Sequence, residues 1–173
     1  TGEPTGDPKV YEQFLPVINE RTDAVINLTT GGSPTMTVEE RLWAAMEVKP
    51  EMCSLNMGSL NFAMFPLADR YKSWKYSWEE PYVRNSDDFI FRNTFRDIEK
   101  IMNIMGDHGT KFEHECYDVG HLYNLAYFAD RGLIKPPFFI QTIFGIMGGI
   151  GADEDNLMFM RKTADKLFGD DYH

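Results

Sequence analysis

Polar or glycine-rich residues follow four short apolar runs of the chain, and these four endings are where chemistry could occur. They read LTTGG at 28–32, CSLNMGSLN at 53–61, ECYDVGH at 115–121 and FGIMGGIGA at 144–152. In parallel α/β folds the functional groups collect at the carboxyl ends of the strands and in the loops that follow. We therefore expect the four endings to lie together at one edge of a sheet.

The first ending is suited to binding an anion. Gly31 and Gly32 allow positive φ and close approach of a ligand to backbone N–H groups, which can cradle a carboxylate or a phosphate. The hydroxyls of Thr29 and Thr30 can donate to the same anion. The simpler alternative is a turn before the next helix. The segment is not a Walker A motif, because no lysine follows the glycines.

The second ending supplies a cluster of hydroxyls and amides. Ser54 and Asn56 are two positions apart, so on a strand they point to the same face. We expect both to line the mouth of the site and to bind substrate. Local turns made by the same side chains are the alternative.

The third ending holds two carboxylates on one face of a strand, Glu113 and Glu115, with His114 and Cys116 on the other. Strands of a parallel sheet are buried on both faces, so carboxylates there must be paired, metal-bound or catalytic. Glu115 is nearer the carboxyl end and is the candidate catalytic residue. For Glu113 an interior ion pair is at least as good an interpretation, and we expect His114 to pack against a helix.

Other kinds of chemistry find less support in the residue spacing. No two histidines have metal-ligand spacing such as His-x-His or HExxH, and no Ser-His-Asp triad is indicated. The glycines of 144–152 lack the GxGxxG spacing, so they predict a mobile or tightly packed loop. An aldolase with a lysine Schiff base is disfavoured, because Lys111 only opens a predicted strand.

Alternating helices and strands must position these endings. Hydrophobic periodicity and capping residues predict helices at 8–21, from Thr37, from Thr94, at 119–131 and at 153–168, and strands at 24–29, 51–56, 111–117 and 138–144. Parallel strands joined by crossovers follow from this order, with no strand before the first helix or after the last. The pattern alone fits equally the middle of a (β/α)8 barrel and a small open sheet.

Composition limits the class of protein. A chain of 173 residues with 43% hydrophobic residues is enough for one packed domain, and a net charge of −10 argues against nucleic acid or an anionic membrane as partner. Two distant cysteines indicate a reducing compartment, and we expect the cytoplasm. The polar start TGEPTGDP is not a signal peptide. An aromatic-rich insertion at about 70–85 is expected to form a cap or a subunit contact.

Four blocks of the chain together resemble a known family. INLTTGGSPTMTVEER, KPEMCSLNMGSLNFAMFP, FEHECYDVGHLYNL and PPFFIQTIFGIMGGIGA are similar to segments of the β-keto acid cleavage enzymes, in the same order. The resemblance implies a zinc-dependent (β/α)8 TIM barrel of which residues 1–173 form a single partial domain, roughly strands 3 to 6. It implies cleavage of a β-keto acid with acetyl-CoA, giving acetoacetate and an acyl-CoA.

The resemblance also assigns roles to individual residues. Thr29 and Ser54 match the family's hydroxyl contacts to the keto acid, and Gly32 matches a backbone amide contact. Glu115 matches the acid of the family's E-x-[aromatic]-D strand end. The family's His-x-His pair and its later Arg and Glu-Asp residues have no counterpart in the chain.

We therefore expect a fragment of a longer homo-oligomeric enzyme, with the Zn²⁺ ligands outside these residues. The alternative is a catalytically inert fragment or a binding module without the metal site.

Overall fold

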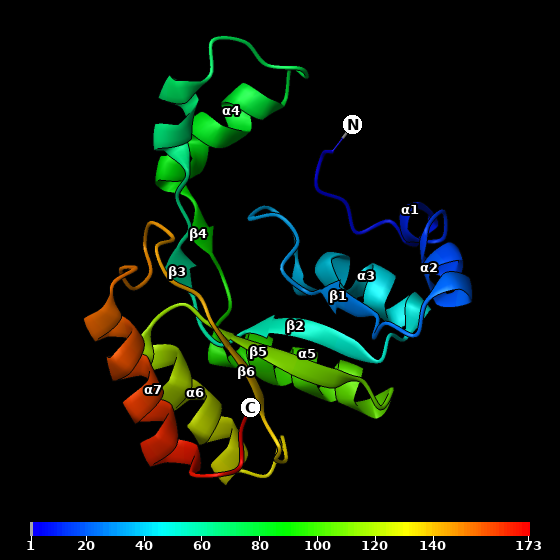
Figure 1. Cartoon of the computed structure of the whole chain (residues 1–173). Coiled ribbons are helices and arrows are strands. Elements are labelled where there is room, and N and C mark those ends of the chain that lie inside the picture. Colours follow the sequence, from blue (N-terminus) through cyan, green and yellow to red (C-terminus); the bar gives the residue numbers. More distant parts are fainter. Residues whose placement is uncertain (1) are drawn as a thin grey trace.

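Parallel strands form the sheet onto which the rest of the chain packs (Figure 1). The structure is a computed structural model, and it describes residues 2–173. Its sheet has the order β1-β2-β5-β6, with every pairing parallel. The strands are β1 Asn27–Thr29, β2 Met52–Asn56, β5 Lys111–Cys116 and β6 Phe139–Thr142. The predicted parallel α/β fold is confirmed, and it is consistent with part of a TIM barrel.

Helices cover one face of this sheet. They are α3 Val38–Val48, α5 Phe95–Asp107, α6 Val119–Asp130 and α7 Glu154–Phe168. Alternate strand residues point into the helices and are buried with them in one hydrophobic core, among them Leu28, Cys53, Leu55 and Cys116. The other strand residues, including Thr29, Ser54 and Glu115, therefore point to the opposite, polar face.

The helices predicted from Thr37 and from Thr94 both begin with a capping box. Thr37 accepts from the backbone N–H of Glu40, whose carboxylate accepts from the N–H of Thr37. Thr94 and Asp97 form the same reciprocal box at the start of α5. Both boxes satisfy backbone N–H groups that a helix leaves free at its first turn.

The first predicted helix is divided in the structure. The segment 8–21 forms α1 Pro8–Tyr11 and α2 Leu15–Arg21. Pro16 lies in the first turn of α2. It would break a continuous helix, because proline has no N–H to donate and its ring meets the carbonyl four residues earlier. Strand β1 is also shorter than predicted, since it begins at Asn27 opposite Met52 of β2.

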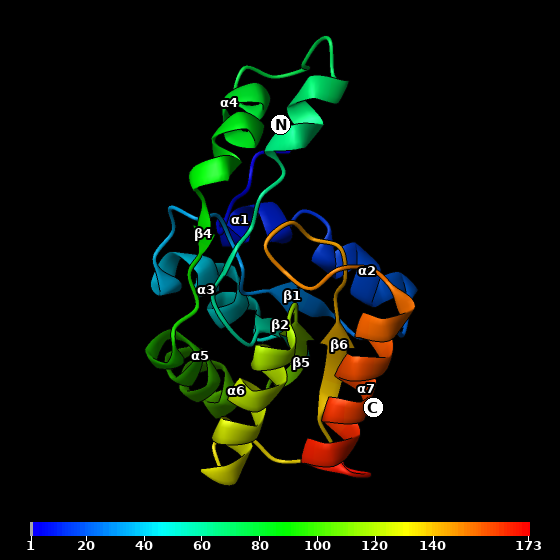
Figure 2. The same cartoon turned by 90° about the vertical axis from the view of Figure 1, so that its left-hand side faces the viewer.

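A helical lobe that the periodicity did not reveal rises from the carboxyl end of β2 (Figures 1 and 2). We use this name for residues 62–89. An antiparallel pair of short strands, β3 Leu60–Asn61 and β4 Ile90–Phe91, carries the lobe. Its helices are η1 Phe65–Arg70, α4 Glu79–Arg84 and η2 Asn85–Asp88. The predicted insertion at about 70–85 lies inside this lobe.

No strand follows the last helix in the described residues, as expected, but the residues after α7 return to the sheet. Gly169, with φ +57°, ends the helix and turns the chain. Tyr172 then pairs with Phe138 in a parallel bridge, and the N–H of Ile140 donates to the carbonyl of His173 at 3.0 Å. Within residues 2–173, no helix is long and apolar enough to cross a bilayer.

Candidate active site

A cavity of about 330 Å³ lies at the carboxyl ends of β1, β2 and β5, beside the helical lobe. We call it the strand-end cavity. Five residues singled out in the sequence line it: Thr29, Gly32, Ser54, Asn56 and Glu115. They come from three strand ends that are far apart in sequence, and the parallel register places them together. Thr29 lies opposite Ser54, and Asn56 lies opposite Glu115.

The fourth glycine-rich ending does not line this cavity, contrary to expectation. Residues 144–152 fold onto the base of the helical lobe, where the N–H of Ala63 donates to the carbonyl of Met147 at 3.1 Å. Gly148, with φ +105°, lies so close to the carbonyl of Asn61 that a Cβ would overlap it. Of the two expectations for this loop, tight packing agrees with the structure.

The loop after β1 is both a turn and a wall of the cavity. The hydroxyl of Thr29 accepts from the N–H of Gly31 at 3.0 Å, which closes the turn. Thr30 is buried and donates to the carbonyl of Ser54 at 2.7 Å. Gly32 has φ +63°, a conformation that favours glycine. Thr29 therefore keeps a hydroxyl proton free to donate into the cavity, whereas Thr30 is committed to the neighbouring strand.

The side chain of Asn56 makes a local turn as well. Its Oδ1 accepts from the N–H of Gly58 at 3.3 Å, and the residue is buried. Ser54 is half-buried and lies beside Thr29 on the polar face. For Asn56 the turn alternative and the cavity placement are therefore both realised, because its side chain closes a turn and the residue still lines the cavity.

The two carboxylates of β5 have different surroundings. Glu113 is buried and accepts from the amide of Asn27 at 2.7 Å, so its partner is a neutral amide rather than the cation expected of an ion pair. Burial and the nearby Glu113 carboxylate raise the pKa of Glu115 to about 7, although a hydrogen bond from Tyr117 opposes the rise. A carboxyl group with this pKa can both give and take a proton near neutral pH.

His114 points to the other face of β5 and takes no part in the cavity. Its ring lies near Phe112 and Phe138, and its Nδ1 is 3.0 Å from the carbonyl of Phe139. Burial lowers the pKa of His114 to about 4. It lies on the face of β5 that points into the helices, buried among these aromatic residues.

Tyr117 is a residue near Glu115 whose role the sequence reasoning missed, and His121 at the start of α6 is buried beside it. Tyr117 lines the cavity, and its backbone N–H donates to Nδ1 of His121 at 3.2 Å. Burial lowers the pKa of His121, which favours the neutral ring that can accept this bond. No Cβ fits at Gly58, because the His121 ring occupies that space. The aromatic position of the E-x-[aromatic]-D strand end was the available signal for Tyr117.

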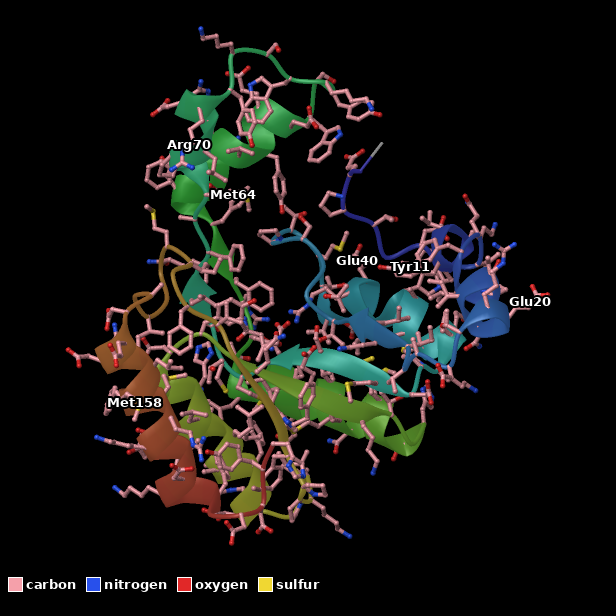
Figure 3. All side chains as sticks on the ribbon, in the orientation of Figure 1. Tyr11, Glu20, Glu40, Met64, Arg70 and Met158 are labelled. Carbon is pink, nitrogen blue, oxygen red and sulfur yellow. The ribbon has the colours of Figure 1, made fainter. Side chains whose placement is uncertain are left out.

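An aromatic wall closes the side of the cavity opposite the sheet. The helical lobe and its strands contribute Phe62, Tyr82, Phe89 and Phe91 to the lining. Met64 of the lobe and Tyr11 of α1 also line the cavity, and Figure 3 shows them approaching from different sides. The cavity thus has a polar floor of hydroxyls, amides and one carboxyl group. Its apolar wall excludes water from part of a bound ligand.

The cavity-lining side chains of residues 2–173 include no lysine, so they provide no Schiff-base nucleophile. In the same part of the chain no three His, Cys, Asp or Glu side chains are grouped so that they could hold a metal ion. The carboxylates of β5 have no histidine beside them on the polar face, so these residues alone do not fit a zinc site. What they can do is hold a small anionic molecule, orient it and move a proton.

Comparison with known proteins agrees with this chemistry. The model of the beta-keto acid cleavage enzyme family matches residues 1–173. The chain is 59% identical over 171 residues to the 3,5-dioxohexanoate:acetyl-CoA acetone transferase of Paraburkholderia graminis, a match that covers 99% of this chain and 55% of that protein.

Two more distant relatives act on other substrates by name. The 3-keto-5-aminohexanoate cleavage enzyme of Acetoanaerobium sticklandii is 31% identical over 160 residues, which is 92% of this chain and 50% of that protein. The 3-dehydrocarnitine:acetyl-CoA trimethylamine transferase of Rhizobium meliloti is 26% identical over 180 residues, with 92% and 53% coverage. The chain spans about half the length of the curated relatives it matches.

Proposed function

The chain belongs to the beta-keto acid cleavage enzyme family, and from that premise we propose that its protein cleaves a β-keto acid with acetyl-CoA. The products would be acetoacetate and the CoA thioester of the remaining fragment. One observation supports this proposal most directly. The residues that the family resemblance assigned to substrate and catalysis all line the strand-end cavity.

The residues of this chain would orient the keto acid and handle its proton. Hydroxyls of Thr29 and Ser54, the N–H of Gly32 and the amide of Asn56 provide hydrogen-bonding groups for the substrate carboxylate and for the oxyanions that develop during the reaction. Glu115, with a pKa raised to about 7 by burial and by Glu113, would move a proton at the carbon between the carboxylate and the keto group.

The bond changes follow from the products. The carbon that loses its proton attacks the acetyl thioester and releases the CoA thiolate. The thiolate then attacks the keto carbonyl, the bond between that carbonyl and the deprotonated carbon breaks, and the carbon leaves as acetoacetate, taking back a proton. The aromatic wall would keep water away from the thioester, which water would otherwise hydrolyse.

We propose 3,5-dioxohexanoate as the first substrate to test, because the relative named for it is 59% identical over almost the whole chain. The full-length protein would be incubated with 3,5-dioxohexanoate and acetyl-CoA labelled in the acetyl group. The expected result is label in acetoacetate and unlabelled acetoacetyl-CoA. Label that stays entirely in acetyl-CoA with every β-keto acid tested would favour the inert binding module, whereas labelled acetoacetyl-CoA would contradict the proposed bond changes.

We propose zinc as a cofactor of the full-length protein, with its ligands outside residues 2–173. Residues 2–173 do not form a metal-binding group, so the ligands would come from the half of the relatives' length that this chain does not match. Metal analysis of the full-length protein tests this: a metal-free preparation with full activity contradicts it.

We also propose a cytoplasmic homo-oligomer, which the unpaired cysteines and the exposed aromatic Tyr71 of the lobe support.

A further inference from the structure

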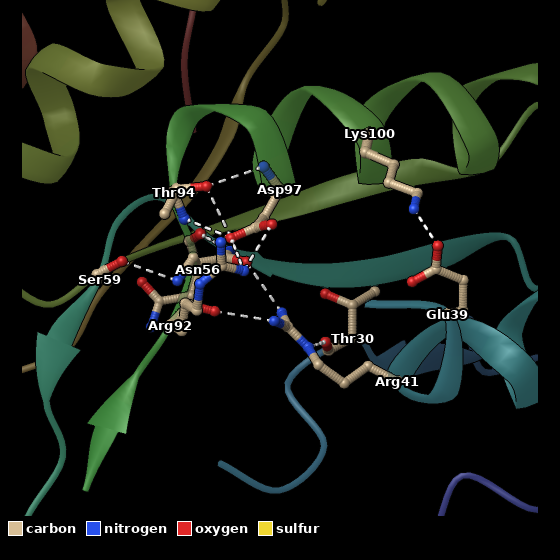
Figure 4. Close-up of polar contacts among 10 residues, drawn as sticks. Thr30, Glu39, Arg41, Asn56, Ser59, Arg92, Thr94, Asp97 and Lys100 are labelled. Atoms are coloured by element: carbon tan, nitrogen blue, oxygen red, sulfur yellow. Dashed lines mark hydrogen bonds and ion pairs between the residues drawn. The ribbon is translucent and has the colours of Figure 1, made fainter. Parts of the chain in front are cut away.

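Arg41 is a buried cation directly behind the glycine loop of the cavity (Figure 4). It projects from α3, and only 7% of its surface is exposed. Its Nε donates to the carbonyl of Thr30 at 2.7 Å, Nη1 donates to the carbonyl of Arg92 at 2.9 Å, and Nη2 donates to Oδ1 of Asn93 at 3.0 Å. One guanidinium thus joins the loop after β1 to the segment after β4.

These three acceptors of the Arg41 guanidinium are all uncharged. Buried cations are usually paired with a carboxylate, and the acid near Arg41 is Asp97. Asp97, however, forms an ion pair with Arg92 at 2.8 Å and caps α5. Burial lowers the pKa of Arg41 and the charge of Asp97 raises it, but a guanidinium stays protonated in either case. Burying this charge costs free energy, because the guanidinium loses its contacts with water. We therefore expect Arg41 to have a role beyond packing.

Arg41 contacts two residues that line the cavity, Gly32 and Phe91. A Cβ at Gly32 would be 2.6 Å from Cγ of Arg41, so the stem of the arginine packs against this glycine. The guanidinium carbon is 5.3 Å from the centre of the Phe91 ring, a cation–π distance. Asn93, which accepts from Arg41, donates through Nδ2 to the carbonyl of Asn56.

We infer that Arg41 is a positioning residue of the strand-end cavity. It holds the glycine loop, the Phe91 side of the aromatic wall and the end of β2 at fixed separations. It does not itself line the cavity. Its planar fork is required, since a lysine ammonium is a point charge on a flexible stem and cannot reach three acceptors in this geometry. The kinetic part of this inference rests on the proposed function, whereas its structural part does not.

The test uses the full-length protein with Arg41→Met and Arg41→Lys. Amide hydrogen exchange should become about ten-fold faster or more at residues 30–33 and 91–93 in both variants, while β5 and α6 keep their protection. With 3,5-dioxohexanoate, kcat/KM should fall about ten-fold or more, with KM for acetyl-CoA within about two-fold, because the anchored residues face the keto acid. Arg41→Lys should recover little of the loss.

Arg131→Met is the matched control. Arg131 is exposed at the end of α6, and its guanidinium lies 3.6 Å from the centre of the Tyr127 ring. This variant also removes a guanidinium over an aromatic ring, but away from the cavity. Exchange at residues 30–33 and kcat/KM should both match the wild-type protein.

The Asn93→Asp variant tests the bond between Arg41 and Asn93 separately from the bond between Asn93 and Asn56. It also leaves the buried cation in place. It keeps an acceptor for Arg41 and adds a charge to pair with it, but it loses the donor to Asn56. Residues 30–33 should stay protected while residues 57–59 exchange faster. Equal loosening of both segments would show that the network does not divide in this way and would overturn the assignment.

Three further outcomes would count against a positioning role. Unchanged exchange at residues 30–33 in Arg41→Met would refute it whatever the activity, as would full rescue of kcat/KM by Arg41→Lys. Faster exchange throughout the sheet with a matching loss of thermal stability would show that Arg41 only maintains the fold. If the wild-type protein cleaves no β-keto acid, the proposed function fails, but the exchange comparison still decides the role of Arg41.

Discussion

Thr29 and Thr30 are adjacent in sequence but have separable tasks. Thr29 lines the cavity and is exposed, whereas Thr30 is 1% exposed and bonds to the backbone of β2. Thr29→Ala should lower kcat/KM by about 10- to 100-fold, the loss expected for a hydrogen bond to a charged group, with little change in stability. Thr30→Ala should lower the free energy of unfolding by about 1–3 kcal/mol, because it leaves the Ser54 carbonyl unsatisfied.

Steady-state kinetics and urea denaturation of the two alanine variants measure this contrast. Each variant serves as the control for the other, since the chemical change is identical and the positions are adjacent. Loss of folding in Thr29→Ala with no separate loss of activity per folded molecule would mean that this threonine only closes a turn.

Glu115 should give the protein a pH dependence of the opposite sign to that of most carboxylates. Its folded pKa is raised from 4.5 to about 7 by burial and by Glu113, so the folded state holds a proton that the unfolded state has released. Stability from this group is present below about pH 4.5 and is lost as pH rises through about 7. Glu115→Gln should remove this decline, as measured by urea denaturation at pH 5 and pH 8.

The exposed Glu154 at the start of α7 provides the comparison for that experiment. Glu154→Gln removes the same charge without burial and should leave the difference in stability between pH 5 and pH 8 as in the wild-type protein. If Glu115→Gln also leaves the difference unchanged, the carboxyl group of Glu115 does not titrate near neutral pH.

At the residue scale, the sequence predicted the side chains that lie at strand ends more readily than the charged helix residue that supports them. Thr29, Ser54, Asn56 and Glu115 could be found because strand ends in a parallel sheet meet at one edge. Arg41 could not, since its partners lie 11 to 52 residues away and a charged helix residue is expected on the surface.

Among the elements, the loop between β6 and α7 is the one most sensitive to a single methyl group. At Gly148 a Cβ would overlap the carbonyl of Asn61, and φ is +105°. Gly148→Ala should therefore destabilise the protein by about 1–3 kcal/mol, through strain and displacement of the loop from β3. Gly120→Ala is the control, because its Cβ would enter open space in the first turn of α6.

Thermal denaturation compares these two variants directly. Gly120→Ala should be neutral or stabilising by up to about 1 kcal/mol, because alanine favours the helix. Equal melting temperatures for the two variants would show that residues 144–152 form a loose loop rather than a packed one.

Helices and long strands were predictable, and the short elements were not. Thr37 and Thr94 each form a capping box with an acidic residue three positions later. Such a local pattern can be recognised in the sequence. The strands β3 and β4 contain two residues each and pair across the whole helical lobe. A two-residue strand has no periodicity, so its existence depends on a partner about 30 residues away.

For the whole molecule, the outer strands of the sheet determine whether the chain associates with copies of itself. In the described part of the chain β1 pairs on one side only, with β2, and exposed apolar residues such as Val25 and Phe139 lie near the sheet edges. Residues 1–173 produced alone should self-associate as concentration rises, because unpaired strand edges recruit other chains. Light scattering against the full-length protein measures this, and a stable monomer at high concentration would contradict it.

The parallel sheet was predictable from the order of elements, but the pairing of the last residues beside it was not. Alternating strands and helices fit a barrel segment and an open sheet equally. Pairing of Tyr172 and His173 beside β6 depends on a turn at Gly169 that has no periodic signature. The numbering of these strands within a barrel remains a prediction.

The two-stranded stalk of the helical lobe has a consequence for how such enzymes diversify. The chain leaves the body of the protein at Leu60 and returns at Phe91, paired across a single ladder, so the two crossing points are only about 5 Å apart. An insert whose ends meet at that spacing could replace residues 62–89 and keep the pairing of β3 with β4, provided that it also keeps the contact of Ala63 with Met147. Exchange of this one segment would therefore replace the aromatic wall except for Phe91, and would change substrate choice while the polar floor stays the same.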